Sequence, residues 1–164
     1  MPKQQHFRNW QVMLKRLLLI HHFSYIRRFT LCLDVVNFFE QLLFSFLTGN
    51  ADMHLKNFSL IKQPGIGYKL SSGYDIVATA LVNPSDDEDL ALTLNGKKRK
   101  INRNDFVVAF SASKLDAKQQ ENIFRKMENQ KLNWFNFIDI SFLSDVFKAR
   151  FKELIEKRFL RINA

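Results

Sequence analysis

Side chains capable of chemistry are concentrated in one short polar stretch of an otherwise phenylalanine-rich chain. The stretch carries two carboxamides, a carboxylate, an imidazole and an ammonium group, at Asn50, Asp52, His54, Lys56 and Asn57. An aspartate followed five residues later by an asparagine is typical of kinase catalytic loops. In such loops the aspartate accepts the proton of the substrate hydroxyl and the asparagine holds a magnesium ion. The spacing therefore predicts a site for phosphoryl transfer.

A second metal-binding aspartate should follow a loop of this kind, and Asp75 is suitably placed. It ends the short, β-prone segment 69–75 and lies 23 residues after Asp52, which leaves room for a hairpin that turns at residues 63–67. Two carboxylates and an amide oxygen could then converge on one hard cation, which prefers oxygen ligands.

A structural interpretation of the same stretch is simpler. Loops rich in Asn, Asp and Gly after a helix are commonly caps and turns, and Asp52 or Asn57 could bond only to local backbone. Two motifs in the right order favour the catalytic interpretation. His54 alone carries little weight, since a single histidine is more often structural than catalytic.

At these residues the sequence resembles the HipA family of bacterial toxin kinases. The family has Pro-Ala where this chain has Ser72-Gly73, a departure that loosens the backbone before Asp75. The resemblance extends over roughly residues 34–160, with later matches at 92–96 and 104–106. The family's G-N-x-D-x-H-x-K-N-F loop and its Y-D-x-x-x-T motif are matched at Gly49, Asn50, Asp52, His54, Lys56, Asn57 and Phe58, and at Tyr74, Asp75 and Thr79.

The resemblance implies a fold and a chemistry. The fold would be mainly α (α+β), the C-terminal helical lobe of a protein-kinase-like enzyme with two small β-hairpins. The chemistry would be Mg²⁺-dependent transfer of the γ-phosphate of ATP to a protein serine or threonine. The implied catalytic residues are Asp52 as the base, with His54 and Lys56 supporting the loop or the phosphates; the implied metal ligands are Asn57 and Asp75, and the loop supports are Gly49 and Asn50.

The resemblance also implies partners. HipA toxins phosphorylate a protein of the translation machinery, typically glutamyl-tRNA synthetase, and are neutralised by a DNA-binding antitoxin. An aminoacyl-tRNA synthetase substrate and a HipB-like antitoxin are therefore expected.

The alternative function is that of a binding module. No glycine precedes Gly49, and Lys3 and Lys15 lack the strand context of a phosphate-binding lysine, so the amino-terminal kinase lobe is not recognisable. Alone, the chain is expected to bind ATP weakly. A catalytically incomplete lobe could instead dock an antitoxin or a separate amino-terminal lobe.

Composition sets broader limits. A chain of 164 residues with 46% hydrophobic residues is expected to form one domain with a sizeable core. The single cysteine, Cys32, excludes an intramolecular disulfide and fits a reducing cytoplasm. The apolar run 17–20 is too short to span a bilayer.

The net charge of +9 is unevenly distributed. Residues 1–33 hold six bases and no acid, whereas residues 34–164 hold 19 bases and 16 acids. The first segment is therefore atypical of the domain that follows; its apolar face at Met13, Leu17 and Ile20 could pack as core, the favoured interpretation, or dock on a membrane surface or partner. The basic cluster 97–100 could bind nucleic acid, but pairing with the acids at 86–89 is favoured, so direct nucleic-acid binding is not expected.

Local signals predict the elements that position the polar stretch. Asp34 is expected to cap a buried helix over 35–47, which Gly49 ends, and a hairpin turning near Pro64-Gly65 should follow. Asn95-Gly96 predicts a second hairpin, with strands over 90–94 and 97–101. The remainder is predicted to be helical, with helices capped by Asn104, Asp116 and Ser144 and another beginning at Trp134.

Overall fold

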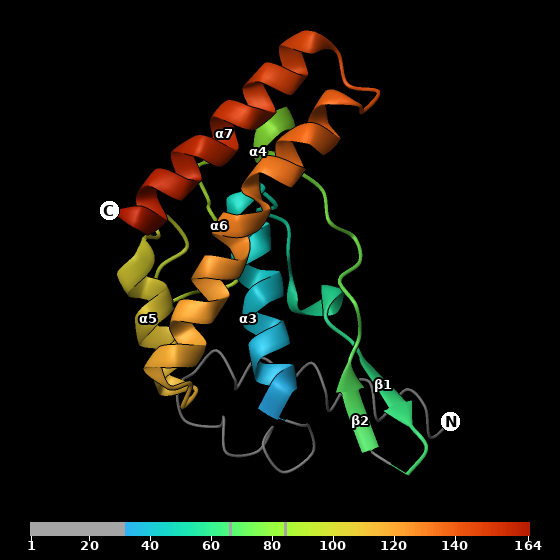
Figure 1. Cartoon of the computed structure of the whole chain (residues 1–164), viewed down its shortest axis with the longest axis vertical. Helices are drawn as coiled ribbons and strands as arrows, with labels where there is room; N and C mark the ends of the chain where they lie inside the picture. The colour runs from blue at the N-terminus through green and yellow to red at the C-terminus, as the bar shows by residue number, and fades with distance from the viewer. Residues whose placement is uncertain (1–31, 66, 84) are drawn as a thin grey trace.

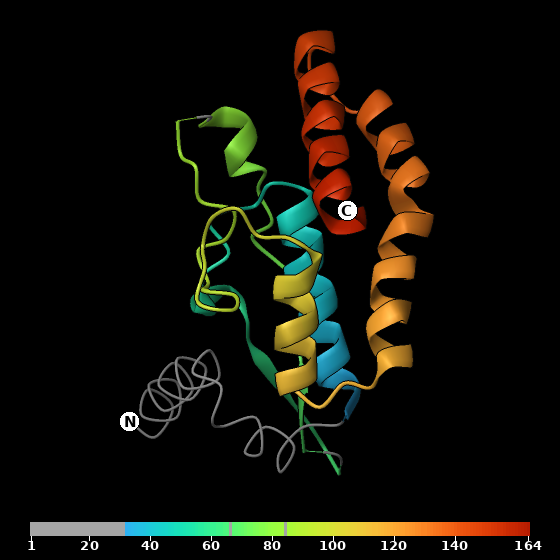
Figure 2. The same ribbon diagram turned by 90° about the vertical axis from the view of Figure 1, so that its left-hand side faces the viewer.

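Helices dominate the computed structural model, which describes residues 32–65, 67–83 and 85–164 (Figures 1 and 2). This confirms the expected fold class, and the apolar face predicted around Met13 lies outside the described residues. In chain order the elements are α3 (Cys32–Leu47), the 3-10 turn η1 (Leu55–Asn57), β1 (Leu60–Gln63), β2 (Gly67–Leu70), α4 (Thr79–Val82), α5 (Arg103–Ala112), α6 (Ala117–Asp139) and α7 (Asp145–Asn163).

The central element is α3, against which α6, α7 and β2 all pack (Figure 1). Its inward face follows the i, i+3, i+4, i+7 spacing of an amphipathic helix, and each of Phe39, Leu42, Leu43, Phe46 and Leu47 is at most 2% exposed. The predicted helix is thus confirmed. Asp34 was expected to cap it but lies inside its first turn, where a carboxylate still interacts favourably with the helix dipole.

The hairpin predicted after the polar stretch is also confirmed. β1 and β2 pair antiparallel, with Leu60 opposite Leu70 and Gln63 opposite Gly67, so that the chain turns at Pro64-Gly65. Gly65 has a positive φ of 77°, a conformation that glycine adopts without steric cost.

The second predicted hairpin forms only its turn. Asn95 and Gly96 both have positive φ, and Leu94 and Lys97 exchange backbone hydrogen bonds of 2.8 and 2.9 Å. The predicted strands do not form, because residues 97–101, which follow the turn, change direction at Lys100, where φ is also positive. The Ile101 N–H then donates to the Asp89 carboxylate rather than to a neighbouring strand.

Two residues of the basic cluster, Lys98 and Arg99, pair with acids at 86–89 as favoured from the sequence, whereas Lys97 pairs with Asp105. Lys97 contacts Asp105 at 2.8 Å, Lys98 contacts Glu88 at 3.2 Å and Arg99 contacts Asp87 at 3.0 Å.

Two helix boundaries differ from the prediction. α5 is capped by Asn102 rather than Asn104, because Asn102 and Asp105 form a capping box in which each side chain accepts the other's backbone N–H. The separate helix predicted from Trp134 is wrong, since α6 continues unbroken to Asp139. Asp116 does cap α6, and Ser144 stands at the N-cap position of α7, as predicted. None of the helices in the described part of the chain is long and apolar enough to cross a membrane.

A buried ionic cluster ties α7 to the rest of the domain. Asp89, which is 4% exposed, accepts hydrogen bonds from the guanidinium groups of Arg158 and Arg161. Both guanidinium groups also lie over the ring of Phe46, at 4.7 and 5.2 Å from its centroid. Phe46 belongs to the last turn of α3, so the cluster joins α7 and the loop after α4 to the end of α3.

Candidate active site

The polar stretch leaves the end of α3 through a tight reversal. Gly49 has a φ of 73°, and its N–H and that of Asn50 donate to the carbonyl oxygens of Phe46 and Ser45, at 3.2 and 2.8 Å. The η1 turn then buries Asn57, which is 2% exposed, at the start of the hairpin. We call residues 48–58 the polar loop.

After β2, residues 71–79 run back along the polar loop, and we call them the strap. All three residues of the second motif lie on the strap and bond to the polar loop. Tyr74 donates its hydroxyl to the Lys56 carbonyl at 2.8 Å, and Asp75 accepts a hydrogen bond from the Asn57 amide at 3.1 Å. Thr79 Oγ1 accepts the Ala51 N–H at 2.9 Å. The two sequence motifs therefore form one hydrogen-bonded unit.

The sequence indicated no such anchoring role for Tyr74 or Thr79, although the motif contains both. The only available signal was their spacing around Asp75. The hydrogen bond between Thr79 and Ala51 is accompanied by a backbone hydrogen bond of 3.0 Å from the Ala80 N–H to the Gly49 carbonyl. The start of α4 is thus joined to the start of the polar loop.

Asp52 and His54 form a pair at the surface of the polar loop. His54 Nε2 lies 2.8 Å from Asp52 Oδ1, and the two side chains are 50% and 57% exposed, respectively. The carboxylate is thus held by the imidazole while remaining accessible to solvent. Lys56, the third predicted catalytic residue, is exposed on the same loop.

Asn57 and Asp75 form the second pair. Asp75 is exposed and has a φ of 55°, a conformation uncommon outside glycine that the flanking hydrogen bonds of the strap help to hold. The Asn57 amide donates through Nδ2, so the amide nitrogen faces the Asp75 carboxylate, and a 180° rotation of the amide group would bring its Oδ1 there as an oxygen ligand. This donor set fits Mg²⁺, which commonly uses one or two protein oxygens together with water and substrate phosphates. Within the described ranges, no group of three or more His, Cys, Asp or Glu side chains offers an alternative metal site.

Asn50, predicted to support the loop, is 1% exposed. Its backbone N–H is bonded, but neither side-chain amide atom has a hydrogen-bond partner. The side chain of Asn50 is thus buried within the polar loop with both amide atoms unpaired, and its supporting role stays a prediction.

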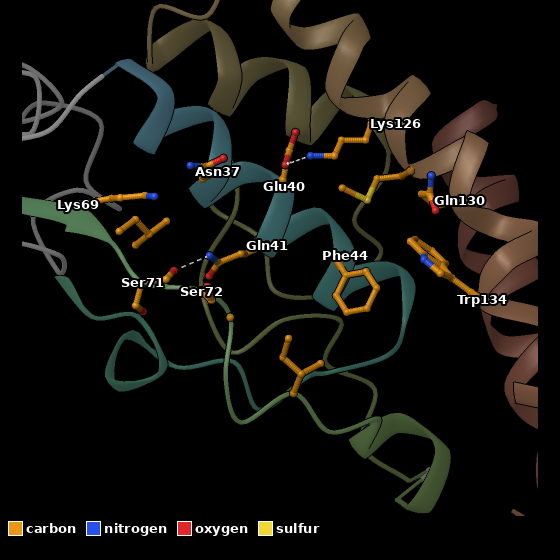
Figure 3. Close-up of a pocket in the computed structure, with 14 residues that line it drawn as sticks. Asn37, Glu40, Gln41, Phe44, Lys69, Ser71, Ser72, Lys126, Gln130 and Trp134 are labelled. Atoms are coloured by element: carbon orange, nitrogen blue, oxygen red, sulfur yellow. Dashed lines mark hydrogen bonds and ion pairs between the residues drawn. The ribbon is translucent and has the colours of Figure 1, made fainter. Parts of the chain in front are cut away.

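A groove of about 460 Å³ lies behind the strap, between α3, β2 and α6 (Figure 3). The Gln41 amide donates to the Ser71 carbonyl at 3.0 Å, and this bond joins α3 to the start of the strap. A Cβ at Gly73 would lie 3.1 Å from Ile76 Cδ1, so Gly73 stands at a close approach within the strap. The strap is therefore held from both sides despite the Ser72-Gly73 substitution.

Thr79→Val should destabilise the domain by about 1–3 kcal/mol, because it removes the acceptor of the partly buried Ala51 N–H without changing side-chain volume greatly. Urea unfolding followed by circular dichroism measures the change. Thr93→Val, at an exposed threonine, is the matched control and should shift stability by less than about 0.5 kcal/mol. Equal effects of the two substitutions would contradict an anchoring role for Thr79.

Comparisons with known proteins agree with the resemblance carried by the two motifs. The family model for the HipA-like C-terminal domain matches residues 5–134. The match overlaps the range expected from the motifs at residues 34–134, but it begins within the first segment and ends before residue 160. The putative kinase Y4dM of Sinorhizobium fredii is 50% identical over 46 residues, which are 28% of this chain and 11% of that protein.

A solved structure gives a likeness of fold. HipA from the Shewanella oneidensis complex of HipA, HipB and operator DNA superposes with a TM-score of 0.64 at 22% sequence identity. The superposition covers 76% of this chain and 30% of that one. The chain thus corresponds to less than a third of the length of that HipA chain.

Proposed function

Because the chain belongs to the family of HipA-like C-terminal domains, we propose that it is the helical lobe of a serine/threonine kinase toxin. The proposed reaction is Mg²⁺-dependent transfer of the γ-phosphate of ATP to a protein hydroxyl. The observation that carries the proposal is the contact of the two motifs, which sets Asn57 beside Asp75 and leaves the Asp52 carboxylate open to solvent.

Each pair of site residues has its own role. Asp52 accepts the proton of the attacking hydroxyl, and the His54 imidazole holds the carboxylate in place. Asn57 and Asp75 would hold Mg²⁺, which would supply positive charge to neutralise the phosphates of ATP. Lys56 is close enough in sequence to Asn57 to place an ammonium group near the phosphates. Tyr74 and Thr79 keep the strap on the polar loop.

We propose a HipB-like antitoxin as the partner and a protein such as an aminoacyl-tRNA synthetase as the substrate, both in the cytoplasm. The support for the partner is the solved HipA relative, whose complex contains HipB and operator DNA.

A second candidate function is that of a binding lobe without catalysis. Its support is the solved HipA relative, which is found in a complex with HipB and operator DNA, so that docking to a partner is one of the functions open to this lobe. The two candidates differ in whether phosphate transfer appears when an amino-terminal kinase lobe is supplied.

Asp75→Asn should lower both ATP affinity and phosphate transfer by about 10-fold or more, because it removes a formal charge from the proposed metal site. Raising the Mg²⁺ concentration should restore part of both. Calorimetric titration with ATP and a radiolabelled transfer assay, in the presence of a HipA amino-terminal lobe, measure the two quantities across a Mg²⁺ series. Asp86→Asn, at an exposed acid in the loop after α4, is the control and should change neither. An Asp75→Asn effect that does not respond to Mg²⁺ would contradict the metal role.

A further inference from the structure

The polar loop is in contact with a helix that lies outside the family match. The family model ends at residue 134, whereas α7 covers Asp145–Asn163. α7 nevertheless packs against both α3, which precedes the polar loop, and α4, which follows the strap (Figure 2).

A close approach is made between Leu154 on α7 and Gly49 at the start of the polar loop. A Cβ built on Gly49 would lie 2.6 Å from Leu154 Cδ2, a distance that real Cβ atoms essentially never show. It would also lie 3.2 Å from the Cβ of Ala80. The backbone of Gly49 therefore lies between α7 and α4, and a side chain at position 49 would require Leu154 to move, in addition to the strain of a φ of 73°.

Two further contacts hold α7 in register with this one. One helical turn before Leu154, Arg150 Nη2 donates to the Leu81 carbonyl of α4 at 3.3 Å. One turn after it, Arg158 binds Asp89 and lies over Phe46, the residue whose carbonyl accepts the Gly49 N–H. Leu154 thus lies between two residues whose polar contacts set the position of α7 along its own axis relative to the polar loop.

We propose that α7 is a positioning element for the polar loop and that Leu154 is its principal positioning residue. Leu154 touches neither substrate nor metal ligand; it acts by confining Gly49, from which the chain runs to Asp52. Misplacement of a reacting group by about 1 Å can lower a rate on the order of 100-fold. A small increase in the mobility of the polar loop would therefore lower the rate of phosphate transfer. The catalytic consequence rests on the proposed function, whereas the structural one does not.

Amide hydrogen exchange measured by NMR tests the structural part. The N–H groups of Ala51 and Ala80 are the probes, because their hydrogen bonds to Thr79 Oγ1 and the Gly49 carbonyl close the polar loop. Leu154→Ala should accelerate exchange at both by about 10-fold or more relative to amides in the middle of α6. Leu154→Met, a volume-conserving change, should restore protection.

Leu160→Ala is the matched control, since Leu160 is on the same helix but 69% exposed, and it should leave the two probes unchanged. Equal acceleration of exchange at the two probes and in α6 would overturn the proposal, because it would show that Leu154 contributes only to global stability. No acceleration at the probes would also overturn it, because Leu154 would then contribute nothing to the loop.

A kinetic measurement then tests the link to catalysis. With the amino-terminal lobe supplied, Leu154→Ala should lower kcat by about 10-fold with little change in the KM for ATP, and Leu154→Met should recover most of the rate. A fall in kcat that Leu154→Met fails to recover would overturn the link. Lack of transfer by the unsubstituted protein would instead count against the proposed function, and the exchange comparison would still decide the role of α7.

Discussion

Asp52→Asn should lower the rate of phosphate transfer by about 10²–10⁴-fold, the range commonly lost with a general base, while ATP affinity stays largely intact. The asparagine has nearly the same shape but cannot accept the proton of the attacking hydroxyl. Nucleotide affinity should be preserved because Asp52 pairs with His54, whereas the proposed metal ligands are Asn57 and Asp75.

Phosphate transfer and ATP affinity, measured across a Mg²⁺ titration, separate the two carboxylates. The rate of Asp52→Asn should not recover at high Mg²⁺, unlike that of Asp75→Asn. His54→Gln is an informative companion, since it removes the imidazole that holds Asp52 but leaves the base itself, and its effect should be smaller. If the two aspartate variants respond alike to Mg²⁺, the assignment of base and metal ligand is wrong.

Asp89→Asn should lower the free energy of unfolding by about 3–5 kcal/mol, because it leaves the buried guanidinium of Arg158 without its counter-charge. This is a large part of the stability of a typical domain, which is about 5–15 kcal/mol. Chemical denaturation measures the loss. Asp87→Asn is the matched control, because Asp87 pairs with Arg99 at the surface, and such pairs contribute about 0–1 kcal/mol. Similar losses for the two variants would contradict a special role for the buried cluster.

The effect of Asp89 should depend on pH in a defined direction. Burial alone would raise the pKa of Asp89, but hydrogen bonds from Arg161 and the Ile101 N–H, with the charges of Arg158 and Arg161, outweigh it and lower the pKa below 3.8. A carboxylate with a lowered pKa stabilises the fold above its unfolded-state pKa and loses this contribution as the pH falls through the folded one. The stability difference between the parent protein and Asp89→Asn should therefore shrink as the pH falls below 3.8.

Local features of the fold could be predicted from the sequence. The buried face of α3, the end of that helix before Gly49 and the turn at Pro64-Gly65 are set by residues that are neighbours in the chain. The cap of α5 was also within reach, since Asn102 is followed three residues later by Asp105, the pattern of a capping box. Asn104 is an equally good cap by residue type, but it has no such partner.

Contacts between distant residues could not be predicted in the same way. Thr79 binds the Ala51 N–H across 28 positions, and Arg158 reaches Asp89 across 69. Periodicity and capping preferences describe only a few successive residues, so they give no signal for such pairs. The spacing of Thr79 after Asp75 in the second motif was the one pointer to its position. The same limit explains why the hairpin predicted at Asn95-Gly96 forms only its turn. The turn residues specify the reversal of the chain, but the contact of the Ile101 N–H with Asp89 draws residues 97–101 away from a strand pairing.

The hairpin between the polar loop and the strap has a consequence for how the site assembles during folding. Asn57 and Asp75 are separated by a segment that pairs with itself, so its closure requires little loss of chain entropy beyond that of forming β1 and β2. Hairpins of this size form in about 1–10 μs, far faster than contacts that join distant parts of a chain. The metal-binding pair can therefore come together early from a single contiguous stretch of chain, while the packing of α7 against Gly49 must wait until the carboxyl end is in place. Newly made chains would then hold a nearly formed but unconfined site before α7 docks.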